Sequence, residues 1–389
     1  MLNETTLELL SERLVNRIEG ANSYILRLIG EQIARIGGMT PTNANRLVHM
    51  LKYGGHYDKI ASELARISNL NLQEIYVIFE EVAKSDYRFA KQFYDYKEMK
   101  YIPYEENYSL QTMVRDLATQ TATDYLNLSN TLGFRKVVDG KVVYSSLRDT
   151  YMNTIDEAVL SLNQGTATYQ EMVKNTIKEL GSSGIRTVNY ESGYSRRLDS
   201  SVRMNIMDGM RNLHNEMQKV IAEEVGTDGI EISVHENPAE DHKDIQGKQF
   251  TNAEFEKLNS ELKRPISTMN CYHYIFNIIM GVSEPRYSQE ELDKINEDNE
   301  KGFEFEGKHY TNYEGTQLQR RIETEIRKNK DIHIIAKASG NNELIAESQT
   351  KIRQLTKKYK ELSDVSGLPT KMERLQVEGF KRVNLKELK

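Results

Sequence analysis

The residues best suited to chemistry are His235, His242, Cys271 and His273, which fall within one stretch of the sequence. Imidazole nitrogen and thiolate sulfur are ligands that zinc prefers in proteins. Cys271 and His273 are two positions apart, so on an extended strand both side chains would point to the same face. Zinc modules usually contain two close pairs, whereas His235 and His242 are seven positions apart. Two interpretations stay open: a zinc site, or a small buried thiol beside hydrogen-bonded core histidines.

Several groups that a catalytic site would need cannot be identified around the same residues. A cysteine nucleophile needs a base and a third group that orients the base, and no third group is identifiable. The acidic residues between Glu236 and Asp244 could form an acid–base pair or bind a hard metal ion, but they are also typical of a solvated loop. No glycine-rich loop is followed by the lysine of a phosphate-binding loop. We therefore predict that the protein is not an enzyme; a metal-dependent nuclease or peptidase that uses the His and Cys residues is the alternative.

A basic stretch near the end of the chain is a candidate for DNA binding. From Thr316 onward the sequence has 17 Lys and Arg against 10 Asp and Glu, a balance of +7, so that the first 315 residues carry −13 of the total of −6. Acidic residues interrupt the stretch and aromatic residues are sparse, so a solvated, salt-bridged helix face is the competing interpretation. The candidate DNA-binding residues are Arg320, Arg321, Arg327, Lys328, Lys357 and Lys358.

The elements that would carry these residues are mostly helices. Apolar residues recur at steps of three and four from Leu7 to Ile36, which predicts a long helix that ends at Gly37-Gly38. Thr40-Pro41 suits the start of a second helix, which Gly54-Gly55 would interrupt. Asn71-x-x-Glu74 could close a capping box at the start of a third helix.

The middle of the chain predicts a linker, more helices and then a strand. Tyr101–Asn107 contains proline and is aperiodic, so it is the first predicted linker. A short β-hairpin is expected around Asp139-Gly140, and a long amphipathic helix over Leu198–Glu224. Apolar and polar residues alternate from Gly229 to Val234, which predicts a strand that opens a small α+β unit.

The last part of the sequence predicts a hairpin at Phe303–Phe305 and a long basic helical region that ends before Gly367. Within it a stripe of apolar residues follows heptad-compatible steps. Such a short stripe could support an oligomeric coiled coil or a helical hairpin that packs on the body. The stripe consists of Ile345, Ile352, Leu355, Tyr359 and Leu362.

Taken together, the patterns predict a mainly α protein with a small α+β domain. The expected parts are an N-terminal helical module (1–100), a helical body (108–225), the compact α+β unit (226–287) and a hairpin with a basic helical tail (288–389). With 38% hydrophobic residues and no apolar run long enough to cross a bilayer, a soluble protein is expected. One cysteine and no signal-peptide pattern favour synthesis in a reducing cytoplasm.

A string of motifs in the α+β unit is specific enough to suggest a family. Ser233-Val-His235 leads to Asp241-His242, and Gly281–Glu291 closes the segment. The structural motif between them consists of Gln246, Gly247, Phe250, Pro265, Asn270, Cys271 and His273. With these motifs the chain resembles the phage minor capsid proteins of type 2, which are related to phage head-morphogenesis (minor head) proteins. The resemblance covers roughly residues 150 to 385.

The resemblance implies a structural minor head protein, made in the host cytoplasm and incorporated into the virion head at the portal vertex. Its partners would be the portal protein, other capsid components and, in one version, packaged DNA. It implies roles in head assembly or in DNA packaging and ejection, without a cofactor or a small-molecule substrate. The Cys-x-His motif and the upstream histidines would then be a structural signature that holds the small domain together.

Overall fold

The computed structural model describes residues 4–40, 42–44, 56–129, 131–138, 140–189, 192–268, 271 and 273–386. The predictions that rest on Pro41, Gly54-Gly55, Asp139 and Asn270 lie outside these residues. The described part is mainly helical with small antiparallel sheets, which confirms the predicted fold class. None of its helices is both long and apolar enough to cross a membrane.

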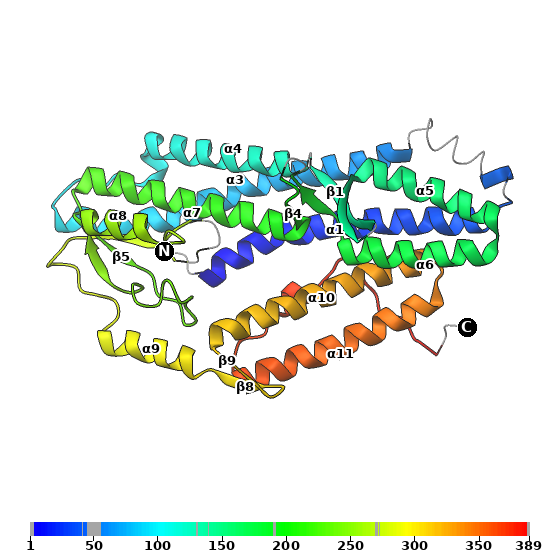
Figure 1. Cartoon of the computed structure of the whole chain (residues 1–389). Coiled ribbons are helices and arrows are strands. Elements are labelled where there is room, and N and C mark those ends of the chain that lie inside the picture. Colours follow the sequence, from blue (N-terminus) through cyan, green and yellow to red (C-terminus); the bar gives the residue numbers. More distant parts are fainter. Residues whose placement is uncertain are drawn as a thin grey trace.

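Long helices form an elongated bundle, with β5 and α8 at one end and α5 and α6 at the other (Figure 1). Helices α10 and α11 lie along one side of this bundle. The helices of the first 225 residues are α1 (Glu4–Gly37), α3 (His56–Tyr96), α4 (Tyr108–Ser129), α5 (Leu147–Gln164), α6 (Thr166–Ser183) and α7 (Leu198–Val225).

The first predicted helix is confirmed as α1, which ends at Gly37, but the capping box at Asn71 is wrong. Helix α3 continues through Asn71, which is fully buried. Its side-chain amide donates to the hydroxyl oxygen of Tyr125 (3.0 Å), while Glu74 pairs with Arg13 (3.2 Å). Because these two side chains have tertiary partners, they do not cap a helix here.

The predicted linker at 101–107 is a packed connection. It contains a short 3-10 helix, Tyr104–Glu106, in which Tyr104 is buried. The ring of Tyr101 stacks on that of Tyr87 in α3, with centroids 5.0 Å apart. Aromatic stacking of this kind ties the connection to the bundle.

The predicted hairpin around Gly140 is confirmed as β1 (Leu132–Val138) and β2 (Lys141–Ser146). Two short strands, β3 (Arg186–Val188) and β4 (Ser195–Arg197), complete a sheet with the order β2-β1-β3-β4. Strand β2 is therefore at the edge of this sheet.

The small α+β unit contains β5 (Gly229–Ile232), β6 (Gln249–Thr251), α8 (Asn252–Glu261) and β7 (Ile275–Ile278). Strand β5 is central and pairs antiparallel with both neighbours. The apolar core of the unit is small, and its buried members are Ile232, Phe255, Ile266 and Cys271.

The C-terminal region starts with α9 (Gln289–Lys301) and the hairpin β8 (Phe303–Phe305) and β9 (Lys308–Tyr310). Helices α10 (Asn312–Ser339) and α11 (Asn342–Ser366) follow, and then a 3-10 helix, Met372–Leu375. Helices α8, α9 and α10 each begin with a complete capping box, in which Ser or Thr and a Glu three positions later satisfy each other's backbone N–H groups.

Helices α10 and α11 form a helical hairpin against the bundle (Figure 1). Ile345 joins the main core, and Ile352, Tyr359 and Leu362 join a second core with β8. The heptad-like stripe thus packs inside this chain, as the hairpin interpretation expected.

One main core extends from Leu10 in α1 to Ile345 in α11. This core includes residues from all four predicted parts, 1–100, 108–225, 226–287 and 288–389. The division into these parts stays a prediction. Helices α6 and α10 come close at Gly181, where an added Cβ would lie 2.7 Å from the backbone nitrogen of Ile332. Only glycine permits this approach.

A buried charge cluster joins α1, the start of α7 and α10; it consists of Glu19, Arg197, Asp199, Arg327 and Asp331. A guanidinium nitrogen of Arg197 lies 2.8 Å from a carboxylate oxygen of Asp331, and Arg327 Nε lies 3.2 Å from Asp199. Burial and the nearby Asp199 carboxylate raise the pKa of Glu19 to about 8, so Glu19 is mostly protonated at neutral pH. The carboxylates of Asp199 and Asp331 then face the two guanidinium groups.

Candidate metal centre

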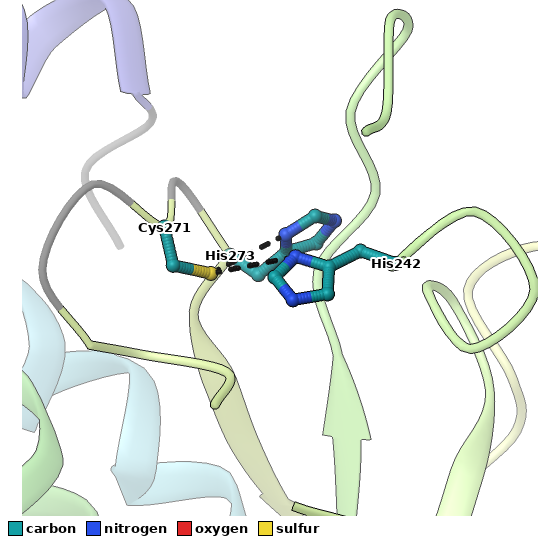
Figure 2. Close-up of side chains that lie close together, drawn as sticks. All are labelled: His242, Cys271 and His273. Atoms are coloured by element: carbon teal, nitrogen blue, oxygen red, sulfur yellow. Dashed lines mark hydrogen bonds between the residues drawn. The ribbon is translucent and has the colours of Figure 1, made fainter. Parts of the chain in front are cut away.

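Three of the four predicted ligands converge in the α+β unit: His242, Cys271 and His273. All three are buried, with exposed fractions of 2%, 4% and 3%. The sulfur of Cys271 lies 3.8 Å from His242 Nδ1 and 3.6 Å from His273 Nδ1 (Figure 2). One ligand atom from each residue lies within 4.8 Å of the other two.

Two separate segments supply these side chains. His242 lies in the turn between β5 and β6, which is closed by backbone bonds such as His242 N–H to Ala239 O (2.9 Å). Gly247, at φ +71°, turns the chain back so that its N–H donates to Ile232 O. Cys271 and His273 come from the irregular segment just before β7, not from the strand itself.

The position of the proton on His242 follows from its second ring nitrogen. Nε2 lies 2.7 Å from the carbonyl oxygen of Arg264, which can only accept a hydrogen bond. A neutral His242 therefore carries its proton on Nε2 and directs the Nδ1 lone pair towards Cys271.

The same reasoning applies to His273. Its Nε2 lies 3.2 Å from Gln246 Oε1, an oxygen that also accepts the backbone N–H of His235 at 2.9 Å. Gln246 thus presents its oxygen to His273, whose Nε2 must donate. The Nδ1 lone pair of His273 then also points towards Cys271.

Burial keeps His273 neutral. It lowers the pKa of His273 to about 2, with a further contribution from the neighbouring His235 and His242. Burial opposes ionisation of the Cys271 thiol, but the contact with His242 and the backbone groups of His273 and Ser267 together outweigh burial, so the pKa of Cys271 is lowered. Burial likewise acts against protonation of His242, yet its bonds with Cys271 and Arg264 raise its pKa.

The fourth predicted ligand, His235, lies beside this triad but outside it. Its ring centroid is 4.4 Å from that of His273, in an edge-to-face arrangement. Among the described residues, His242, Cys271 and His273 are the one group of His, Cys, Asp or Glu side chains whose ligand atoms all lie within 4.8 Å of one another.

The acidic loop does not join the triad. Asp241 is held by the guanidinium group of Arg264, with Nε 2.8 Å from the carboxylate, and this hydrogen bond lowers the pKa of Asp241. Glu236, Glu240 and Asp244 are exposed, as expected of a solvated loop.

The structural motif surrounds the triad. Gln246 and Gly247 are buried in the turn, and Phe250 packs against the small core. Pro265 directly follows Arg264, whose carbonyl oxygen accepts the bond from His242.

The triad lies on the wall of a cavity of about 1250 Å³ that is also lined by residues of α3, α7 and α10. The cavity also reaches His214, which the sequence did not single out. His214 lies between Asp86 Oδ2 (2.6 Å) and the carbonyl oxygen of Ile275 (2.7 Å), and so connects α7 to both α3 and β7. A single histidine in an amphipathic helix carries no spacing signal that could have revealed this role.

The six candidate DNA-binding residues differ in burial and in ion pairing. Arg327 is buried in the charge cluster, so it cannot reach a phosphate backbone in this conformation. Lys328, Lys357 and Lys358 each pair with a glutamate. Arg320 lines the cavity, and Arg321 is exposed.

These features define a mainly helical protein with a small α+β unit that contains a buried His–Cys triad. The chain belongs to the family "Phage minor capsid protein 2", whose model matches residues 2–364. The protein is therefore a structural component of the phage virion. No curated protein and no solved structure matches the chain.

Proposed function

We propose that this protein docks at or near the portal through its helical body and acts in head assembly or in DNA packaging and ejection. Its family, a family of minor capsid proteins, supports a role among head components. The portal protein is the partner that we propose within the head.

The hairpin β1–β2 is the observation that supports docking through the body. Val137, Val138, Val142 and Val143 are all exposed, and Val137 pairs directly with Val142 across the hairpin. Residues that face each other across two strands share one face, so Val137 and Val142 form an apolar patch, and Val138 and Val143 lie on the other face. Grouped apolar side chains on a surface typically mark a protein interface.

Copurification with the cognate portal ring tests this proposal. We expect the full-length protein to be retained by a co-expressed portal ring at physiological salt. The double variant Val137→Lys/Val142→Lys should lose retention, because charged side chains would have to be desolvated at the interface. The control Val282→Lys/Val365→Lys changes two exposed valines elsewhere and should be retained. A wild-type protein that the portal ring never retains would refute docking.

We further propose that the protein works without enzymatic activity. One observation favours the alternative of a metal-dependent hydrolase, since the triad lines a cavity. Against it, the nearby Asp241 is engaged by Arg264 and the other described loop carboxylates are exposed, so none of the loop carboxylates is positioned as a general base for the triad. Zinc-supplemented wild-type protein should cleave neither DNA nor peptide substrates. Cleavage that disappears in Cys271→Ser would establish the hydrolase instead.

Contact with packaged DNA is a lesser part of the proposal and rests on the exposed basic residues of α10 and α11. Binding through phosphates should weaken steeply between low and moderate salt, because counterions are released. Arg321→Ala/Lys357→Ala should reduce that salt dependence. Binding that does not depend on salt, or no binding at all, would show that DNA is not a partner of these residues.

A further inference from the structure

We propose that His242 Nδ1, Cys271 Sγ and His273 Nδ1 bind one zinc ion, with water from the adjacent cavity as the fourth ligand. This inference does not depend on portal docking. It rests on three observations: the direction of the lone pairs, the distances between the ligand atoms and the two segments that they would join.

With both histidines neutral, the lone pairs and protons of the triad do not match. Both histidines donate through Nε2, to the oxygens of Arg264 and Gln246, so both Nδ1 atoms offer lone pairs to the same sulfur. A thiol has one proton and can donate it to only one of the two nitrogens. The other nitrogen lone pair then faces a sulfur lone pair in a buried site, which is unfavourable. A metal ion satisfies all three atoms at once.

The distances fit such an ion. In a tetrahedral site, Zn–S bonds of about 2.3 Å and Zn–N bonds of about 2.0–2.1 Å place sulfur and nitrogen about 3.6 Å apart. The observed distances from Cys271 Sγ are 3.6 and 3.8 Å. Metal-bound histidines typically donate their other N–H to a carbonyl or carboxylate, which fixes the ring, and His242 and His273 both have such a partner.

Zinc also matches the softness of the ligands. A thiolate and two imidazoles suit zinc better than magnesium or calcium, which prefer oxygen. Three protein ligands leave one tetrahedral position for water, and the cavity wall that contains the triad provides access to it.

The consequence of zinc binding would be mechanical. His242 belongs to the turn between β5 and β6, whereas Cys271 and His273 belong to the segment that leads into β7. The ion would cross-link both sides of the central strand in a unit whose own apolar cluster has four buried members among the described residues. Small domains with little core are commonly stabilised by a structural metal.

Elemental analysis of the full-length protein, loaded with zinc and then dialysed without chelator, tests the site. We expect about one zinc per chain, as one three-ligand site requires. Cys271→Ser and His273→Ala should retain far less, while His309→Ala, which removes an exposed histidine on β9, should retain the wild-type amount. His235→Ala should also retain zinc; a loss equal to that of Cys271→Ser would overturn the three-residue site.

Cobalt substitution of the wild-type protein keeps the test valid if the variants fail to fold. Cobalt(II) bound to a thiolate in tetrahedral geometry gives intense visible d–d bands and a sulfur-to-cobalt charge-transfer band in the near ultraviolet. We expect both bands to saturate at one equivalent and to disappear on addition of zinc. Wild-type protein that retains no zinc and shows no cobalt bands overturns the proposal.

Discussion

The charge cluster of the helical bundle and the His–Cys triad of the α+β unit both bury polar groups, but they satisfy them differently. The charge cluster brings Arg197 and Arg327 to the carboxylates of Asp199 and Asp331 and thus contains both signs of charge. The triad contains three Lewis bases and no cationic side chain of its own.

This difference shows how each region depends on its surroundings. The charge cluster forms once α1, α7 and α10 have packed, because its guanidinium groups and carboxylates then pair with each other. The triad, in contrast, is complete only with a proton or a metal ion from solution. We therefore expect the bundle to respond to changes in its own residues, and the small unit to respond to zinc.

The largest effect should come from removing Asp331. The variant Asp331→Ala leaves the guanidinium group of Arg197 buried beside a single carboxylate, and breaking a buried pair in this way costs about 3–5 kcal/mol in the free energy of unfolding. Urea denaturation measures this loss in the free energy of unfolding. Asp364→Ala removes an exposed acid from α11 and should change stability by less than about 0.5 kcal/mol. Equal losses in both variants would contradict the importance of the pair.

Zinc should stabilise the small unit independently of the charge cluster. At free zinc 100-fold above its dissociation constant, binding to the native state alone adds about 2.7 kcal/mol. The same increment is expected in Asp331→Ala, because the two clusters share no residue and distant effects add. Thermal unfolding with and without zinc tests this, and Cys271→Ser should show no increment. A zinc response that vanishes in Asp331→Ala would mean that the two regions are coupled.

The close approach of α6 and α10 should tolerate no side chain. In Gly181→Ala the new methyl group would lie 2.5 Å from Ile332 Cγ1 and 2.7 Å from its Cα, so the helices must separate. Such overpacking costs about 1–3 kcal/mol. Since Ile332 is next to Asp331, the charge cluster should be disturbed as well. Gly38→Ala, where the nearest atom is 3.7 Å away, is the control for urea denaturation. Similar stability of both variants would argue against this helix contact.

The last effect concerns the pH dependence of stability. The pKa of Glu19 is raised from 4.5 to about 8 in the folded state, so folding takes up a proton between these values. The contribution of Glu19 is fully present below its unfolded pKa and declines as the pH rises towards about 8. Glu19→Gln cannot lose this proton, so its stability should fall less between about pH 5 and pH 9. An identical slope in both proteins would show that Glu19 is ionised in the native state.

Local patterns in the sequence predicted many elements correctly. The periodicity of α1, the glycine that ends it and the β1–β2 hairpin are all properties of short segments. The same approach failed at Asn71, where the pattern of a capping box is present but the side chain is used in a contact with Tyr125. A short-range pattern cannot reveal a partner that lies far away in the sequence.

The site, like the helices, was only partly predictable from local sequence patterns. Residue types alone selected the two histidines and the cysteine that meet, and also His235, which lies beside them. Sequence spacing could not decide between these histidines, because the turn at Gly247 and the segment before β7 determine which ring nitrogens face the sulfur. The tautomers depend on two acceptors, the backbone carbonyl oxygen of Arg264 and the side-chain Oε1 of Gln246, and only the fold brings these oxygens to the two rings.

By itself, the sequence determined the helical character of the chain, the small α+β unit and the set of residues able to bind a metal, since these follow from periodicity and side-chain chemistry. Only the tertiary structure decided that Arg327 is a core residue and not a surface cation, and that α10 packs against α1. The physical reason is that burial and charge pairing depend on contacts between segments hundreds of residues apart, such as Asn22 and Asp331.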